Sequence, residues 1–201
     1  MRNKSTFAAV VLGLLLTAAC GIAQPSKALI EKAKTEITNR DYDKAVSYLK
    51  IVLGDEPDND EAYAQRARAY YLSKNSSAAL DDANAALKIN PHNVTALNLR
   101  GLIKKDAKQL DEALADFSAA IAADPAFVKP YLNRAAIYLA RGEYDKTIAD
   151  ETRALAMEPD KLLALFGRGV PQNEETALTW FKKAAAQGNQ DAMDVPKKLG
   201  K

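Results

Sequence analysis

The chain has 201 residues, with 28 Lys+Arg against 26 Asp+Glu, so its formal net charge of +2 gives no electrostatic case for binding nucleic acid. Its single Cys excludes a disulfide framework within the chain and any multi-cysteine zinc site, and its single His excludes metal sites that need two histidines. Hydrophobic residues make up 48% and charged residues 27%, which is the balance of a chain that can fold.

The first residues have the features of an export signal. Arg2 and Lys4 form a positive start, residues 7–16 are almost entirely apolar, and small residues follow. A positive start, an apolar core of about ten residues and a small-residue end are typical of a secretory signal peptide. The apolar run is too short for a permanent membrane-spanning helix, which needs about 20 residues.

The residues around the only cysteine refine this expectation. The segment Leu16-Thr17-Ala18-Ala19-Cys20 resembles the lipobox of bacterial lipoproteins, in which small residues precede an obligate Cys. The resemblance implies that residues 1–19 are a lipoprotein-type signal peptide and that Cys20 carries the lipid. Gly21 at the next position implies an outer-membrane anchor facing the periplasm in a Gram-negative source. The alternative is ordinary cleavage after Ala23, which would release a soluble periplasmic or secreted protein.

After a linker over residues 20–25, the chain repeats itself. Pro57, Pro91, Pro125 and Pro159 are each 34 residues apart, and a similar phrase precedes each of them. A fixed period of this length indicates a stacked repeat architecture. Aligned on the prolines, the four repeats span residues 26–59, 60–93, 94–127 and 128–161.

Each repeat predicts two amphipathic helices, here called helix A and helix B. In the second repeat we expect helix A over about residues 60–73 and helix B over about residues 77–89. The small residues Ala67 and Ala79 let the two helices approach closely. Proline ends helix B, since it lacks an N–H and disfavours helical geometry in the residue before it. Capping or turn chemistry around each restart is expected from Asp58, Asn59, Asn93 and Asp124.

This 34-residue pattern resembles the tetratricopeptide repeat (TPR). The resemblance implies an all-α fold, a right-handed α-solenoid of antiparallel helix pairs whose A helices line a concave face. The bulky packed position of helix B falls on Leu49, Ala83, Phe117 and Glu151. The charged residue in the fourth repeat predicts either a looser helix pair or an edge exposed to solvent.

Residues 162–201 follow a different pattern. The segments Gly167-Arg168-Gly169-Val170-Pro171 and Trp180-Phe181, with a later Gln-Gly-Asn turn, resemble a Sel1-like repeat. The resemblance implies a helix over about residues 174–187 that packs against the fourth repeat. A short helix over residues 190–199 would then cap the stack.

Catalytic patterns are missing from the sequence. His92 is expected in an exposed turn between repeats, and paired carboxylates such as Asp81 and Asp82 are adjacent on a helix, where their side chains diverge. We therefore expect no enzyme activity, no metal, no cofactor and no small-molecule substrate.

The TPR resemblance places a peptide-binding groove on the A helices. Lys34, Arg68 and Lys105 recur at nearly matching positions and predict a basic stripe for acidic side chains or a terminal carboxylate. The alternative is an ordinary solvated charged face. The full set of predicted groove residues is Lys34, Arg68, Tyr71, Asn98, Leu102, Lys105 and Lys129.

The leading functional prediction is a membrane-anchored periplasmic scaffold that recruits partner proteins in envelope, pilus or secretion assembly. The alternatives are a soluble exported TPR binding module and an accessory domain of an enzyme. TPRs that bind chaperone tails hold a terminal carboxylate with Lys, Asn and Arg side chains. Over repeats 1–3 the matching positions are Ile30, Lys34, Gln65, Thr95 and Leu99, and over repeats 2–4 they are Ala64, Arg68, Leu99, Lys129 and Asn133. Neither set matches, so docking to a cytosolic chaperone is not expected.

Overall fold

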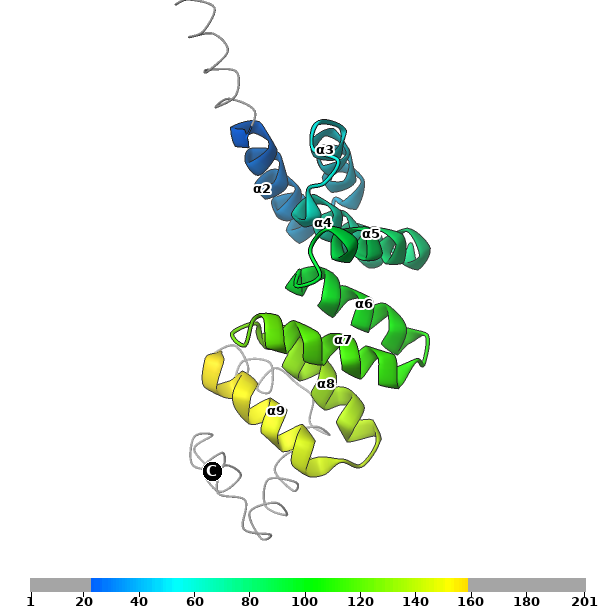
Figure 1. Ribbon diagram of the computed structural model, residues 1–201, viewed down its shortest axis with the longest axis vertical. Helices are drawn as coiled ribbons and strands as arrows, with labels where there is room; N and C mark the ends of the chain where they lie inside the picture. Colours follow the sequence, from blue (N-terminus) through cyan, green and yellow to red (C-terminus); the bar gives the residue numbers. More distant parts are fainter. Residues whose placement is uncertain (1–22, 159–201) are drawn as a thin grey trace, which may run out of the picture. The chain divides into compact units, whose positions relative to one another are not determined.

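The computed structural model describes residues 23–158, which form eight α-helices (Figure 1). Consecutive helices pack in pairs, which confirms the expected all-α fold. The predicted signal peptide, Cys20 and the Sel1-like residues 162–201 lie outside the described residues. The pairs are α2 (Ala23–Asn39) with α3 (Tyr42–Asp55), α4 (Asp60–Leu72) with α5 (Ser76–Ile89), α6 (Val94–Asp106) with α7 (Leu110–Ala123), and α8 (Val128–Ala140) with α9 (Tyr144–Met157).

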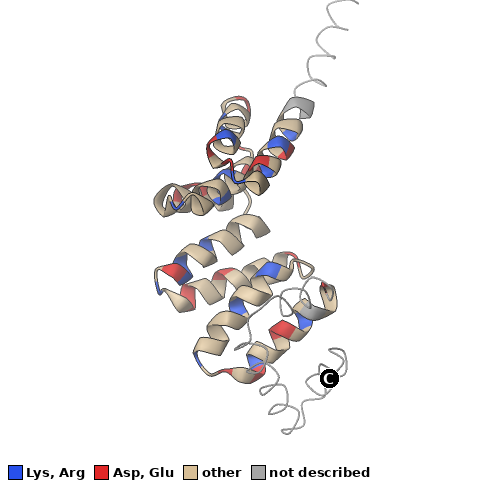
Figure 2. Ribbon diagram, turned by 180° about the vertical axis from the view of Figure 1, so that it is seen from behind, with Lys and Arg blue, Asp and Glu red and all other residues tan. Residues whose placement is uncertain are grey.

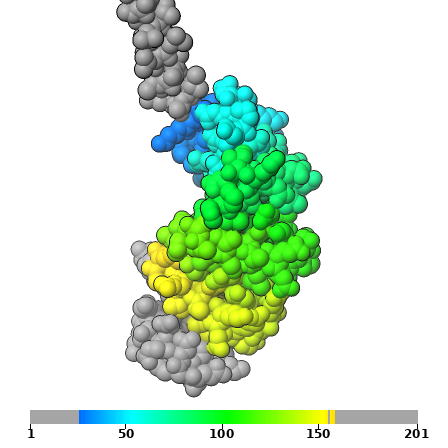
Figure 3. Space-filling model, in the orientation of Figure 1, coloured from blue at the N-terminus to red at the C-terminus, as the bar shows by residue number. Residues whose placement is uncertain are grey.

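The chain divides into two compact units, one on each side of the boundary between Pro91 and His92. The first unit contains α2 to α5 and the second contains α6 to α9. In the face that Figure 3 shows, the atoms of α8 and α9 form a continuous surface. None of the helices within residues 23–158 combines the length and apolar character needed to cross a membrane.

The helix ends follow from the repeated polar residues and prolines. Each B helix ends two residues before a proline of the 34-residue series. Asn59 accepts a hydrogen bond from the backbone N–H of Ala62 at 2.8 Å, and Asn93 accepts one from Ala96 at 2.9 Å. Asp124 bonds the N–H of Ala126 at 2.9 Å in the turn before α8. The capping and turn chemistry expected of Asn59, Asn93 and Asp124 is confirmed.

The turns between helix A and helix B use a left-handed residue. Arg40, Lys74 and Lys108 have φ of 66°, 69° and 64°, and Gly142 has φ of 73° at the equivalent place in the fourth repeat. Side chains with a Cβ rarely adopt this conformation, and each instance costs roughly 1–2 kcal/mol. Only the fourth repeat carries the glycine that would have predicted this turn.

The start of α2 differs from the predicted linker. The helix begins at Ala23, so the last three residues of the expected linker are helical. Pro25 lies in the first turn of this helix. Its missing N–H is tolerated there, because the N–H groups of a first turn have no acceptor within the helix.

The fourth helix pair also differs from expectation. Glu151 on α9 is only partly exposed, and burial, together with the neighbouring carboxylate of Asp150, raises the pKa of Glu151 to about 7. Thr147, which replaces an alanine at the helix crossing, is fully buried and donates its hydroxyl to the carbonyl of Glu143 at 3.2 Å. The expected solvent-exposed edge at Glu151 is therefore wrong, because the carboxyl group itself is desolvated. The alternative of a looser helix pair stays a prediction.

Small residues allow the two helices of a repeat to approach closely. Ala67 and Ala79, which were expected at the crossing of α4 and α5, are both fully buried. In the third repeat the crossing residue is Gly101. A Cβ added there would lie 2.6 Å from Cε1 of Phe117, a ring that is itself fully buried. The distance between α6 and α7 is thus set by the absence of a side chain at Gly101.

Two glycine substitutions test this packing. We expect Gly101→Ala to lower the free energy of unfolding by about 1–3 kcal/mol, because the Phe117 ring has no free space to move into. Gly54 in α3 is the matched control, since an added Cβ there meets nothing within 4 Å. Gly54→Ala should be neutral or stabilise by up to about 1 kcal/mol. Urea unfolding followed by circular dichroism measures both values, and equal effects would contradict the packing argument.

Candidate protein-binding surface

Three repeats join helix A to helix B through a buried ion pair. In each pair the guanidinium donates two hydrogen bonds to the two carboxylate oxygens, with distances between 2.6 and 2.9 Å. The Asp side chains are only 6–10% exposed. Bidentate pairs fix geometry as well as contributing energy, so they set the rotation of each A helix relative to its B helix. The pairs are Arg66–Asp82, Arg100–Asp116 and Arg134–Asp150.

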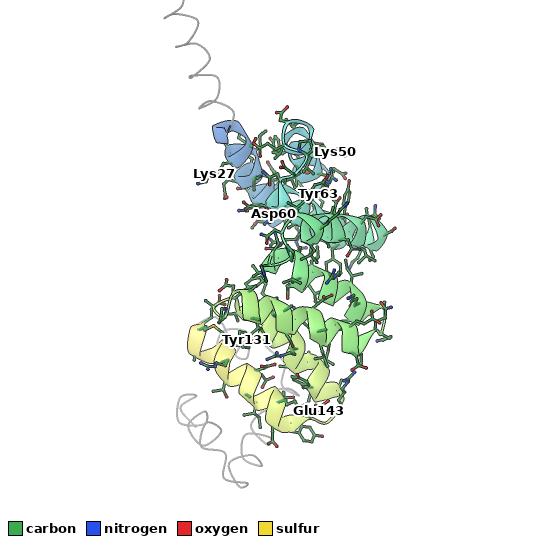
Figure 4. The ribbon with its side chains drawn as sticks, in the orientation of Figure 1. Lys27, Lys50, Asp60, Tyr63, Tyr131 and Glu143 are labelled. Carbon is green, nitrogen blue, oxygen red and sulfur yellow. The ribbon has the colours of Figure 1, made fainter. Side chains whose placement is uncertain are left out.

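Aromatic rings also contact the Arg side chain of two of these ion pairs, and a lysine contacts the Asp side chain of the third. The Arg134 guanidinium lies 6.0 Å from the ring centre of Tyr131 and 5.9 Å from that of Tyr138. Arg66 lies 5.4 Å from the ring of Tyr63 (Tyr63 and Tyr131 are labelled in Figure 4). In the third repeat Lys104 instead contacts the Asp116 carboxylate at 2.9 Å. These contacts add to the interactions that stabilise each ion pair.

The sequence contained a signal for these pairs. Arg66, Arg100 and Arg134 are 34 residues apart, and each precedes its Asp partner by 16 residues. The first repeat has Lys32 and Tyr48 at the corresponding positions, so the pattern holds in three repeats of four.

In the first unit, the predicted groove residues lie on α2 and α4. Lys34 on α2 contacts the carboxylates of Glu31 at 2.9 Å and Glu61 at 2.5 Å. Its charge is therefore already balanced by two neighbours. Arg68 and Tyr71 on α4 are both half-buried, and within residues 23–158 the Arg68 guanidinium has no ion-pair partner.

In the second unit, the predicted residues lie on α6 and α8. Asn98 is only 7% exposed, and its Oδ1 accepts a hydrogen bond from Nδ2 of Asn133 on α8 at 2.9 Å. Leu102 packs against the cluster around Phe117, and Lys105 is half-buried one turn further along α6. Lys129 is exposed at the start of α8.

The structure thus brings part of the predicted set together. Asn98, Leu102 and Lys105 share one face of α6, because their spacing of four and three residues matches the helical repeat. Asn133, which the sequence analysis compared with chaperone-tail TPRs but did not place in the groove, joins this face to α8. We call the face formed by Asn98, Leu102, Lys105 and Asn133 the α6–α8 surface. The continuous basic stripe through Lys34, Arg68 and Lys105 stays a prediction, because its members belong to two units.

Charge alone does not distinguish this surface. Basic and acidic residues are scattered over the helices of both units (Figure 2). What distinguishes the α6–α8 surface is the combination of a buried amide pair, an apolar side chain and a cation on two contacting helices.

The comparisons with known proteins decide the family. The tetratricopeptide repeat family matches residues 30–94 and 98–161, which together make up more than half of the chain. The chain belongs to the tetratricopeptide repeat family. The Sel1 repeat matches residues 153–189, so this TPR protein also carries the second repeat type that the sequence resembles. No curated protein matches the chain.

Solved TPR structures share the fold at low identity. A structure described as Pseudomonas aeruginosa pilF has a TM-score of 0.68 at 16% identity, covering 90% of this chain and 77% of that chain. The first TPR of Spaghetti (RPAP3), bound to an HSP90 peptide, has a TM-score of 0.53 at 24% identity and covers 59% of this chain and 94% of that one. MamA has a TM-score of 0.56 at 23% identity, covering 68% of this chain and 80% of its own. At these identities the likeness shows the fold alone.

The Arg–Asp pairs predict a large difference between single and double substitutions. We expect Arg134→Leu to lower the free energy of unfolding by about 3–5 kcal/mol, because it leaves the buried Asp150 carboxylate without a partner. Adding Asp150→Leu should restore most of that loss, since no unpaired charge then remains.

A surface pair in the same unit provides the control. Arg141 contacts Asp111 at 2.8 Å, but the Asp111 side chain is 88% exposed. Arg141→Leu should cost less than about 1 kcal/mol. Urea unfolding of the four proteins gives the comparison. If Arg134→Leu costs no more than Arg141→Leu, the buried pair does not tie the helices as described.

Proposed function

We propose that this TPR protein is an exported adaptor that binds an extended segment of a partner protein on the α6–α8 surface. The TPR repeats make the chain a protein-binding module. The observation that supports this particular surface is the amide pair of Asn98 and Asn133, placed beside Leu102 and Lys105.

These side chains have the chemistry to bind a peptide backbone. A side-chain amide has two N–H donors and an acceptor oxygen with two lone pairs, so the Asn98–Asn133 bond leaves donors and an acceptor for another chain. An extended backbone presents matching N–H and C=O groups. Leu102 offers an apolar contact and Lys105 a positive charge. Because the Arg100–Asp116 and Arg134–Asp150 pairs fix α6 and α8, this set is arranged before a partner arrives.

The comparisons support a peptide ligand without identifying it. The RPAP3 domain that shares this fold is bound to an HSP90 peptide. We do not propose that ligand, because neither register fits the chaperone-tail TPRs. Ile30, Thr95 and Leu99 break the pattern over repeats 1–3, and Ala64 and Leu99 break it over repeats 2–4.

For the location of the protein, the N-terminal sequence supports an outer-membrane lipid anchor at Cys20, with the repeats in the periplasm. The pilF-like fold, which covers 90% of the chain, supports a role in envelope or pilus assembly. The alternative is a soluble exported TPR module, and substitution of Cys20 distinguishes it from the lipid-anchored protein.

The binding surface is tested by Leu102→Arg. The first two repeats carry Lys34 and Arg68 at the equivalent position, so the fold accommodates a long cation there. Ile51→Arg is the control, since Ile51 is an apolar side chain on α3 that is 53% exposed. After crosslinking in intact cells, Leu102→Arg should reduce the captured partners by about tenfold or more, corresponding to about 1.4 kcal/mol of binding free energy. Ile51→Arg should capture the same partners as the unmodified protein, and equal capture by both variants would refute the proposed surface.

The anchor is tested by Cys20→Ala. We expect this variant to leave the membrane fraction or to accumulate with its signal uncleaved, because no thiol remains to accept a lipid. Fractionation and mass spectrometry of the N-terminus measure both outcomes. A normally processed variant that stays on the membrane would disprove the lipid anchor, and a mature chain that begins after Ala23 would favour the soluble module.

A further inference from the structure

The second unit contains an open pocket at the end of α6. Its volume is about 360 Å³, within the range of about 300–1,000 Å³ that is usual for ligand pockets. One side is charged and the other is apolar. The lining residues are Lys105, Asp106 and Lys108 on the charged side, and Leu110, Ala136, Ile137 and Ala140 on the apolar side.

The pocket exists because two side chains of α8 are short. Ala136 stands where the three earlier repeats have Lys34, Arg68 and Leu102. Ala140 stands where they have Thr38, Leu72 and Asp106. Any of these longer side chains would fill part of the space, so the cavity is a feature of the fourth repeat and of its contact with the end of α6.

Lys105 and Lys108 share one feature among the described lysines: neither has a carboxylate partner, and both line the same pocket. Lys34, Lys104 and Lys146 each contact at least one carboxylate within 2.9 Å. Among the residues that the structure describes, no carboxylate forms an ion pair with Lys105 or Lys108. Asp106 also lines the pocket, so the three charged residues together carry one net positive charge. The backbone of Lys108 also has the left-handed conformation of the turn after α6.

We propose that this pocket binds an acidic side chain of the partner segment together with a neighbouring aliphatic side chain. The carboxylate contacts Lys105 and Lys108, and the aliphatic group packs on Ala136 and Ala140, whose side chains are exposed. Charge complementarity supports the first contact, since two ammonium groups without a described partner lie beside one cavity. The second contact buries apolar surface that α8 otherwise leaves open to solvent. This inference rests on the proposed function, and it names which partner chemistry the end of the α6–α8 surface selects.

The test uses short fluorescent peptides and the full-length protein in detergent. One peptide series contains one Glu and one Leu separated by one to three residues in an Ala-Gly-Ser background. A second series replaces the Glu with Gln, and a third replaces the Leu with Ser. All have amidated C-termini, so that only the side-chain carboxylate is tested. Fluorescence anisotropy gives the dissociation constants, and we expect the Glu–Leu series to bind at least about tenfold more tightly than the other two.

Two variants separate the two contacts. Lys105→Glu combined with Lys108→Glu should remove the preference for Glu over Gln, and Ala136→Leu should remove the preference for Leu over Ser. Lys74→Glu is the control for the first, because Lys74 occupies the same left-handed turn position in the second repeat. Ala115→Leu is the control for the second, because Ala115 is exposed on α7. Both controls should keep both preferences.

The remaining outcomes either overturn the inference or separate it from the proposed function. Absence of a Glu preference in the unmodified protein, or its survival in the double lysine variant, would show that the pocket does not select an acidic side chain. If Leu102→Arg abolishes peptide binding while the pocket variants have no effect, the proposed function stands and the pocket inference falls. If the pocket variants abolish the preferences while Leu102→Arg has no effect in cells, the pocket stands and the proposed α6–α8 surface falls.

Discussion

The close approach of the two helices in each repeat is the constraint on which the rest of the structure depends. Ala67 and Ala79 are fully buried at one crossing, and at another a single added methyl group at Gly101 would clash with the buried Phe117 ring. Protein interiors are packed at crystal-like density, so such a crossing has essentially one solution. The short connection between the two helices of each repeat follows, because it must bring them into this close contact.

The buried Arg–Asp pairs add what small residues cannot provide. Alanine and glycine permit close contact but leave a helix free to rotate or slide against its neighbour. A bidentate ion pair such as Arg134–Asp150 has one favoured geometry, and an unpaired buried charge penalises the alternatives. With the back of each A helix held in this way, its opposite face is presented in a fixed orientation. The α6–α8 surface is therefore a consequence of contacts on the other side of the same helices.

Much of this architecture could be predicted from the sequence. The spacing of the prolines predicted the repeat length, and the small residues predicted where the two helices cross. Asn59 and Asn93 predicted where helices begin. These features are local, or they repeat at a fixed spacing, and each has one dominant physical explanation. The repeated Arg and Asp residues were equally visible, but amphipathic patterns assign charged residues to solvent, and only the packed structure shows that these are buried partners.

The candidate site was harder to predict because its properties depend on neighbours. Lys34 and Lys105 are both A-helix lysines, yet Lys34 is balanced by Glu31 and Glu61, while no carboxylate pairs with Lys105 in the described part of the chain. Glu151 suggested an exposed edge from its charge, whereas burial raises its pKa to about 7. The pocket depends on the short side chains of Ala136 and Ala140. In an alanine-rich chain, the sequence does not distinguish an alanine beside an open space from one packed against a neighbouring helix.

The most direct test of the central claim is photo-crosslinking from single positions in intact cells. A photoreactive phenylalanine analogue at Lys129, which is exposed on α8 four residues before Asn133 and so on the same face, should form a discrete crosslinked product with a partner protein. The same analogue at Ala115, which is exposed on α7, should not. Crosslinks from residue 115 alone, or from neither position in cells where the protein is functional, would contradict the account that the α6–α8 surface binds the partner.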